Sequence, residues 1–284
     1  MTGAPVDRRA TAIILIAALG WPLIEVVGAI LLTRYDPFEV IALRYSAHLA
    51  LLLPVAFWRS GFDLVRTERP VLQLLRGVAM FLMPVLFLAG SATAGAAWVW
   101  GCFWSTVLIV LFGALLVGER PVATAWAVAG IGLVGSWFSR GSPTGPAEAG
   151  LFGVASAVCF AGYVVLSRVL RDEALETSLF YTAVGALVPT LVLAAPAWVS
   201  PTAVDLLPVV GLGALSLLIL GSIDLSLERA GLASVAPWLI AVPALEVVAS
   251  TALGHGLPGR RALFGCGLIV AGLALWAARS EGIS

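Results

Sequence analysis

The sequence predicts an all-α polytopic membrane protein with ten transmembrane helices, arranged as two inverted five-helix repeats around a central cavity. Hydrophobic residues make up 61% of the chain and charged residues only 11%, whereas about a quarter charged is usual in a soluble domain. The apolar residues form ten stretches of about 20 residues, the length that a helix needs to cross a bilayer. Such stretches are too long and too uniformly apolar for barrel strands. A polar interval at Arg140–Glu148 divides them five and five.

Short connections separate the spans, and each contains charged residues, Ser, Gly or Pro, which favour turns over a continued helix. In order, the connections contain Arg34, Arg66, Ser91, Arg120, Arg140, Arg171, Pro201, Arg229 and Pro258. We expect the first five spans at Thr11–Thr33, Pro37–Phe57, Val71–Gly90, Gly95–Val117 and Val122–Phe138. We expect the other five at Ala149–Leu170, Thr177–Val199, Leu206–Leu227, Gly231–Leu253 and Arg261–Ala278. The repeats are then residues 1–140 and 149–284, within one integral membrane unit.

The arginines predict the orientation of the chain in the membrane. Most of them fall on one set of connections and the chain ends, while the other set receives Arg34, Arg140, Arg260 and Arg261. Positive residues accumulate in cytoplasmic loops. We therefore expect a multi-pass protein of the inner (plasma) membrane with both termini in the cytoplasm. Arg44 is taken as the single Arg inside a span.

The two halves of the sequence also resemble each other. Ala94-Gly-Ala-Ala opens the fourth span as Ala230-Gly-Leu-Ala opens the ninth, and Gly77 stands to the third span as Gly213 stands to the eighth. Both pairs share one offset in sequence. Because each half has an odd number of spans, the second half enters the membrane upside down relative to the first. Inverted repeats are common in transporters, with the substrate site at their interface near mid-membrane.

Several short motifs, in their order and spacing, make the whole chain resemble an EamA-type transporter of the drug/metabolite transporter superfamily. They are Ala42-Leu-Arg44-Tyr, Leu75-Arg-Gly, Leu86-Phe-Leu-Ala, Leu115-Leu-Val-Gly-Glu119, Cys159-Phe-Ala-Gly-Tyr-Val-Val-Leu-Ser-Arg168, Pro243, Gly265 and Gly272. The resemblance implies ten helices in two inverted repeats, and a central cavity lined chiefly by helices one, three, four, six, eight and nine. It also implies a small-metabolite substrate without naming it.

The chain departs from the family pattern at two places. Thr106 and Val107 stand where the fourth span often has Pro, and Gly254-His255 stands where the second repeat often has Gly-Glu. These departures argue against a strictly two-fold site. In the first span, Ile24-Glu25-Val-Val-Gly28 is similar to the helix-one Glu motif of small multidrug resistance proteins, which belong to the same superfamily.

Ionisable residues inside spans are the first candidates for function, because a charge at the helix centre costs about 2.5–3.5 kcal/mol on insertion scales. Trp21, Glu25, Gly28 and Leu32 share one helical stripe, beside Pro22, which locally breaks the helix. This stripe suits a cavity wall that binds a cation and titrates with it, so Glu25 is predicted to be the coupling site. The alternative is a structural pair with an interior Arg such as Arg44.

Three further charged residues are candidates for coupling or for another role as intramembrane charges. Glu246 follows Pro237 and Pro243 in a helix that we expect to be kinked, and it is either a second proton or cation site or a group at the extracellular mouth. Asp224 is either an entrance charge or a solvated helix end, and the second is favoured. Arg44 can extend outward, bind a substrate carboxylate or form a structural ion pair, and the pair is favoured.

Aromatic residues complete the predicted substrate cavity. Trp100 and Trp104 share a face of the fourth helix, and Trp238 lies in the matching helix of the other repeat. They either line a pocket for an aromatic or quaternary-ammonium group or face lipid. The predicted cavity residues are Trp21, Glu25, Trp100, Trp104, Tyr163 and Trp238. Glu119 is expected to be a structural cap at the start of the fifth helix or a gate contact.

These observations favour a secondary transporter, and not an enzyme, that moves an amino acid, amine or related cationic or zwitterionic metabolite by alternating access. Coupling to protons or simple facilitation is expected, with export favoured. The alternatives are a multidrug or quaternary-ammonium exporter, an intramembrane enzyme and a non-transporting scaffold. The sequence has no nucleotide-binding loop of the Gly-x4-Gly-Lys-Ser/Thr kind. We expect no cofactor, metal or nucleic-acid partner. The expected partners are the substrate, lipid and, as a candidate coupling ion, the proton; the oligomeric state stays open.

Overall fold

The computed structural model describes residues 7–94, 96–140, 146–254 and 256–281, and within these ranges the chain is helical without strands. The α-helices are α1 Arg8–Leu32, α2 Pro37–Ser60, α3 Pro70–Ala94, α4 Ala96–Phe103, α5 Thr106–Leu116, α6 Ala123–Ser139, α7 Ala149–Val169, α8 Leu175–Ala194, α9 Leu206–Arg229, α10 Leu232–Val235, α11 Ala241–Ala252 and α12 Arg260–Glu281. The 3₁₀ helices are η1 Gly61–Val65, η2 Ala195–Ala197 and η3 Ala236–Ile240. Gly95 and His255, which belong to two of the motifs above, lie outside the described residues.

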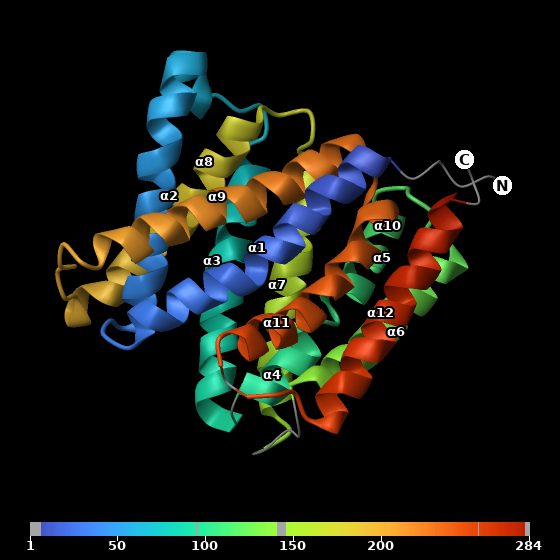
Figure 1. The fold of residues 1–284 in the computed structure, drawn as a ribbon. Helices are drawn as coiled ribbons and strands as arrows, with labels where there is room; N and C mark the ends of the chain where they lie inside the picture. Colours follow the sequence, from blue (N-terminus) through green and yellow to red (C-terminus); the bar gives the residue numbers. More distant parts are fainter. Residues whose placement is uncertain (1–6, 95, 141–145, 255, 282–284) are drawn as a thin grey trace.

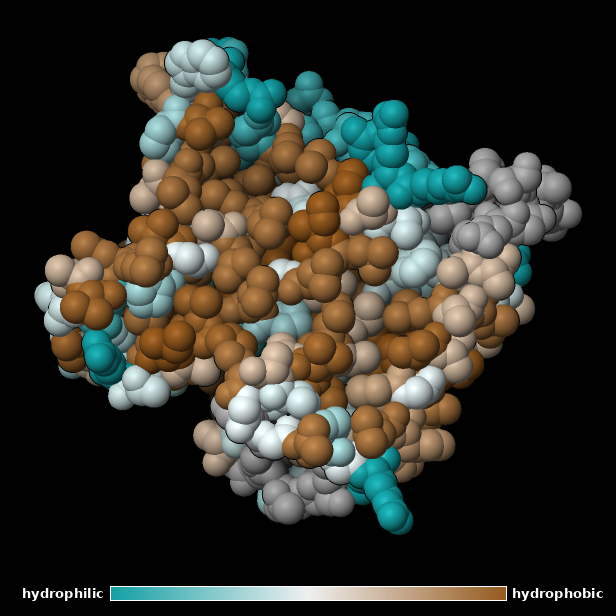
Figure 2. All heavy atoms as spheres, in the orientation of Figure 1, coloured by the Kyte–Doolittle hydropathy of each residue, from teal (hydrophilic) through white to brown (hydrophobic). Residues whose placement is uncertain are grey.

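The helices have the length and composition of membrane spans. In the described ranges, nine helical segments are long and apolar enough to cross a bilayer, and Ala123–Ser139 is a shorter apolar helix. Figure 2 shows that hydrophobic residues cover most of one face, while hydrophilic residues gather mainly at its periphery. The prediction of an all-α polytopic membrane protein is confirmed.

Local chemistry explains how the first two spans begin. Asp7 precedes α1 and its side chain accepts a hydrogen bond from the Arg9 backbone N–H at 2.8 Å. Asp36 does the same for α2 at Phe38, also at 2.8 Å, and Pro37 occupies the first helical turn, where a missing N–H costs nothing. Pro22 lies within α1, which continues without interruption. The predicted local break at Pro22 is therefore wrong.

The regular α-helix is interrupted within both the fourth and the ninth span. The ninth is divided into α10, η3 and α11, with Pro237 in η3, so its helical geometry changes near the prolines where a kink was predicted. The fourth changes from α4 to α5 at Trp104 and Ser105 without a Pro. Instead, the Thr106 hydroxyl donates to the Phe103 carbonyl at 2.6 Å and satisfies the backbone at the interruption.

The packing of the spans follows the exchange of the two halves. The counterpart of α1 in the second half is α7, and the counterpart of α3 is α9. Helix α1 packs most closely on α9, and α3 packs on α7 (Figure 1), so exchanging each helix for its counterpart turns one pair into the other. The pairs α2 with α8 and α6 with α12 map onto themselves. Two repeats would produce this pattern. The repeat limits at residues 1–140 and 149–284 stay a prediction.

Gly77 and Gly213, which correspond in sequence, also make corresponding contacts. A Cβ on Gly77 would lie 2.8 Å from the Gly185 Cα on α8, and a Cβ on Gly213 would lie 2.6 Å from the Ala47 Cβ on α2. Both distances are too short for a methyl group. Glycine therefore permits these helices to meet backbone to backbone, as small residues do at membrane helix interfaces.

Contacts between connections define two ends of the bundle. At the first, the Arg140 end, Arg34 pairs with Asp205 at 2.8 Å. A cavity there touches Thr33, Arg140 and Pro258. At the second, the Arg76 end, the Thr67 hydroxyl donates to Glu173 at 2.9 Å. This separation of the connections agrees with the sorting of loops that the arginines predicted.

Candidate functional site

A cavity of about 320 Å³ opens between α1, α2, α3, α4 and α9. Of the predicted site residues, it is lined by Trp21, Glu25, Arg44 and Trp100. The expectation that helix six lines the cavity is wrong for the described residues, because α7 contributes nothing there and α2 contributes Arg44. The ninth span lines a different cavity, described below. The polar groups of the first cavity stand among apolar and aromatic neighbours, which is the usual composition of a small-molecule site.

Arg140, at the end of α6, joins two carboxylates from different helices. Its Nη2 donates to Glu25 Oε2 of α1 at 3.0 Å and to Glu246 Oε2 of α11 at 2.7 Å. The guanidinium carbon lies 4.4 Å from the centroid of the Trp100 ring. The Trp21 indole N–H donates to Glu25 Oε1 at 3.2 Å. We call these five residues the Arg140 cluster.

The Arg140 cluster carries more acid than base. When both carboxylates are ionised, one guanidinium leaves a net charge of −1. The Oε1 atom of Glu246 is buried without a hydrogen-bond partner in the described part of the chain, whereas the Glu25 side chain is 37% exposed. Buried charge without a partner is unfavourable. The cluster can therefore accept one more positive charge, from a proton or from a cationic group of a ligand.

The cluster also separates two cavities. A second cavity of about 740 Å³ lies among α1, α11 and the start of α12. Among the described residues, the two cavities share only Glu25 and Arg140. Glu246 lines the second cavity. Its two sequence interpretations, a titrating site and a group at a mouth, are thus both compatible with its position.

Arg44 lies on another wall of the first cavity. Its Nε donates to Ser216 Oγ of α9 at 3.1 Å, and the same oxygen lies 3.2 Å from His48 Nδ1. Within the described ranges Arg44 has no ion pair with a carboxylate. Arg44 therefore does not form the ion pair that was favoured for it. The alternative for Glu25, a pair with an interior Arg such as Arg44, is met by Arg140 and not by Arg44.

The predicted aromatic residues lie in different surroundings. Trp21 packs against Phe160 with ring centroids 5.1 Å apart and against Trp104 at 6.2 Å. Trp100, Trp104 and Trp238 are all buried, so the lipid-facing alternative is wrong. Of the three, Trp100 lines the first cavity, whereas neither Trp104 nor Trp238 is among the described lining residues of either cavity.

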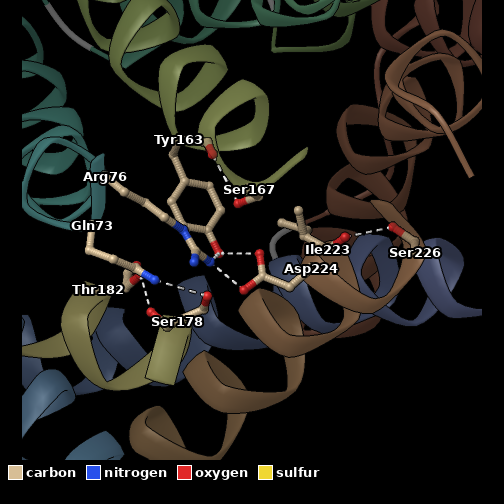
Figure 3. A network of polar contacts seen from close by, with 9 residues as sticks. All are labelled: Gln73, Arg76, Tyr163, Ser167, Ser178, Thr182, Ile223, Asp224 and Ser226. Carbon is tan, nitrogen blue, oxygen red and sulfur yellow. Dashed lines mark hydrogen bonds and ion pairs between the residues drawn. The ribbon is translucent and has the colours of Figure 1, made fainter. Parts of the chain in front are cut away.

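A separate network of polar contacts lies near the Arg76 end of the bundle (Figure 3). Arg76 of α3 donates from Nη2 to the Tyr163 hydroxyl of α7 at 3.0 Å and forms an ion pair with Asp224 of α9. The Tyr163 hydroxyl donates to Asp224 Oδ1 at 3.1 Å. Nearby, the Gln73 amide donates to the Ser178 hydroxyl at 3.4 Å. We call Arg76, Tyr163 and Asp224 the Arg76 triad.

The Arg76 triad corrects three expectations. Arg76 is fully buried inside α3, so Arg44 is not the single Arg of a span. The Asp224 side chain is only 9% exposed, so it is not a solvated helix end. Tyr163 belongs to this network and not to the described lining of the cavity. The three side chains tie α3, α7 and α9 together where the cavity does not extend.

Glu119 makes a cap, although not for its own half of the chain. Its Oε2 accepts the Ala233 backbone N–H at the start of α10 at 3.0 Å, and its Oε1 accepts the Arg168 Nε at 2.9 Å. A Cβ on Gly231 would lie 2.5 Å from the same carboxylate, which explains the glycine. Glu119 therefore connects the two halves by capping α10, and it does not cap the fifth span, which begins after Val122 without a side-chain cap.

Comparison with known proteins agrees with this architecture. Residues 8–141 match the EamA-like transporter family. This part of the chain is similar to EamA-like transporters. Four of the motifs behind the predicted resemblance, at Ala42, Leu75, Leu86 and Leu115, lie within it, and the resemblance to the drug/metabolite transporter superfamily is confirmed.

Relatives match nearly the full length of the chain. An S-adenosylmethionine uptake transporter of Rickettsia felis is 24% identical over 266 residues, which cover 90% of each chain. One of Rickettsia conorii is 23% identical over 268 residues, again 90% of each chain. A crystal structure of another protein superposes with a TM-score of 0.83 at 24% identity, covering 96% of this chain and 99% of that one. The EamA-like domain and these relatives indicate a transporter of a small molecule.

Arg140 is a candidate functional residue that sequence reasoning missed. It was assigned to a connection, because it directly follows the fifth apolar span. Charge balance is the signal that could have found it. Glu25 and Glu246 are acids within spans, and Arg140 is a cation at the same end of the bundle.

Proposed function

We propose that the protein is a secondary transporter, and not an enzyme, for a small cationic or zwitterionic metabolite. The observation that carries this proposal is the 320 Å³ cavity whose wall combines Glu25 with Trp21 and Trp100. A carboxylate beside aromatic rings suits a sulfonium or ammonium group, because both attract positive charge. Transport would proceed by alternating access between inverted repeats at residues 1–140 and 149–284.

S-adenosylmethionine is the first compound to test. It carries a sulfonium cation, an amino acid group and an adenine ring, which match the acidic and aromatic wall of the cavity. The relatives named for its uptake are 24% and 23% identical to this chain. At this identity we extend the chemical class of their substrate to the chain, and we treat the compound itself as the leading member of that class.

We further propose that the Arg140 cluster is the coupling site. Its net charge of −1 can be neutralised by a proton or by the substrate cation, so that each would displace the other. Glu25 is the primary titrating group, because it belongs to both cavities. Glu246 is the alternative. A carrier without proton coupling would be driven by the substrate gradient and could run in either direction. The sequence favoured export, whereas the relatives are named for uptake.

The orientation belongs to the same proposal. We place the protein in the inner membrane with both termini in the cytoplasm and the Arg140 end outside. Cysteine labelling tests this in intact cells, using a variant that lacks the native cysteines. Arg260→Cys should react with an impermeant maleimide and Arg66→Cys should not, since both positions are exposed at opposite ends. The reverse result would overturn the orientation.

Transport in proteoliposomes tests the function. Vesicles loaded with unlabelled S-adenosylmethionine should accumulate the labelled compound by counterflow. A thermal-shift panel of amino acids, amines and nucleosides at two pH values should show stabilisation by cationic compounds that weakens at the lower pH. Preference for tetraphenylphosphonium over every metabolite would favour the multidrug alternative. Absence of both counterflow and thermal shift for all cations would overturn the proposal.

A further inference from the structure

The first cavity has a positively charged wall as well as an acidic one. Arg44 of α2 lines it together with Leu212 and Ile219 of α9, while Glu25 lines it from α1. Glu25 and Arg44 form no ion pair in the described structure. Glu25 and Arg44 therefore do not neutralise each other, and both line the cavity.

The terminal nitrogens of Arg44 are available to a ligand. A guanidinium has five N–H donors, and Arg44 uses Nε for Ser216. In the described part of the chain, neither Nη1 nor Nη2 of Arg44 has a hydrogen-bond or ion-pair partner. A planar guanidinium that presents two parallel N–H groups matches the two oxygens of a carboxylate.

Arg44 is also held in place. Ser216 and His48 are fully buried, and Ser216 Oγ contacts both Arg44 Nε and His48 Nδ1. Arg44 lies about 10 Å from the start of its helix, at 1.5 Å per residue. Because its Nε is fixed to a buried hydroxyl at this depth, its guanidinium stays at the cavity wall and does not extend outward to the membrane surface.

We propose that Nη1 and Nη2 of Arg44 bind a carboxylate of the transported compound, so that the cavity selects zwitterions. The substrate carboxylate would lie at Arg44, and its cationic group would lie at the Arg140 cluster. The aromatic residues Phe87 and Phe103 line the same cavity. This inference rests on the proposed function and assigns a second recognition point within the same site.

Three related compounds separate the contributions of the carboxylate and of the sulfonium to binding. S-adenosylmethionine has both the sulfonium and the carboxylate, its decarboxylated form lacks the carboxylate, and S-adenosylhomocysteine lacks the sulfonium. Binding of each would be measured by calorimetry on purified wild-type protein, Arg44→Gln and Arg44→Lys. A charge-assisted hydrogen-bond pair corresponds to about a ten- to hundredfold change in affinity. Arg44→Gln should weaken both carboxylate compounds by this factor and leave the decarboxylated compound unchanged, while Arg44→Lys should recover part of the loss.

Two further variants guard against a folding effect. Arg66→Gln removes an exposed Arg whose pair with Asp63 lies in η1, and it should bind all three compounds as wild type does. Ser216→Ala keeps the charge of Arg44 but frees its Nε, so it should cause a smaller loss for the two carboxylate compounds alone. If Arg44→Gln cannot be purified, Ser216→Ala and Arg44→Lys still allow the carboxylate compounds to be compared with the decarboxylated compound.

The outcomes distinguish this inference from the proposed function. If wild type binds the adenosyl compounds and Arg44→Gln weakens all three equally, the carboxylate assignment is overturned and transport stands. If inorganic phosphate competes with the substrate at Arg44 while acetate does not, a phosphate-bearing substrate replaces the zwitterion. If wild type binds none of the compounds and no other cation, the proposed function fails, and this inference fails with it.

Discussion

The Arg140 cluster and the Arg76 triad use the same chemical groups in opposite ways. Each holds a guanidinium against carboxylate and aromatic side chains, with the guanidinium carbon 4.4 Å from the Trp100 centroid in the first and 4.7 Å from the Tyr163 centroid in the second. The triad balances one acid with one base, and the Arg76 side chain is 1% exposed. The cluster has two acids for one base, and the Arg140 side chain is 36% exposed.

The difference indicates that the Arg76 triad and the Arg140 cluster have different roles. A balanced and buried ion pair has nothing to gain from a ligand, and the space beside the Arg76 triad is only about 20 Å³. An unbalanced pair beside two cavities can bind a proton or a cation. We infer that the Arg76 triad holds one end of the bundle closed in this structure, while the Arg140 cluster binds and titrates. The following experiments test that contrast.

The largest expected effect is on stability at the Arg76 triad. Asp224→Asn leaves the Arg76 charge buried without its counter-ion, and breaking a buried pair costs about 3–5 kcal/mol. Thermal unfolding in detergent should show this loss. Arg66→Gln is the matched control, because its exposed pair with Asp63 should contribute about 0–1 kcal/mol. If both variants unfold like wild type, the triad does not hold the bundle together.

At the Arg140 cluster, Glu25→Gln should leave the fold intact and remove the pH dependence of transport. The neutral amide can still accept from the Trp21 N–H, but it cannot be exchanged between a proton and a cation. Glu25→Asp should retain some activity, since the charge remains with a shorter reach. Transport rates across a pH series would measure both. A normal rate and pH profile in Glu25→Gln would move the coupling assignment to Glu246.

Trp100 and Trp104 should separate binding from packing. Trp100→Leu removes the ring beneath Arg140 and beside the cavity, so cation binding should weaken by about 0.5–2 kcal/mol. Trp104→Leu changes the buried packing around Trp21, so it should lower the melting temperature more than the affinity. Calorimetric binding and thermal unfolding on the same samples compare the two. Unchanged affinity in Trp100→Leu would remove this ring from the cation site.

The smallest expected effect lies at Asp205, in the connection before α9 and outside the spans. Hydrogen bonds from the Thr202 and Tyr35 hydroxyls, with Arg34 nearby, lower the pKa of Asp205 from 3.8 to about 2. Because the folded pKa is lower, Asp205 contributes stability above its unfolded pKa and loses it as the pH falls from about 4 to 2. Tryptophan fluorescence during unfolding over this range should show a steeper decline in wild type than in Asp205→Asn. Equal slopes would contradict the assignment.

The fold class and spans could be predicted because apolar length and short polar connections are local properties of the sequence. The site depended on side chains that are distant in sequence. Arg140 follows an apolar span and was counted as a loop residue, although it contacts acids more than 100 positions away. Asp224 has its ion-pair partner 148 positions away. No helical period shows such contacts.

Trp100 and Trp104 show that a local rule can predict neighbours without predicting the cavity lining. The four-residue spacing predicts a common face, and the two ring centroids lie 5.6 Å apart, although α4 ends at Phe103. Which of the two rings lines the cavity depends on the packing of other helices. The sequence offered a hint in Thr106, at a place where the family often has Pro, since both residues accommodate an interrupted backbone.

The glycine contacts between the halves have a consequence for motion. At Gly77 with Gly185, and at Gly213 with the Ala47 backbone, no long side chains interlock across the interface. Helices that interlock must change rotamers before one can move past the other, because packed interiors leave little free volume. Helices that meet at bare backbone can shift without that step. At these glycines in the α3–α8 and α2–α9 contacts, little side-chain bulk would have to be displaced for one helix to shift on the other.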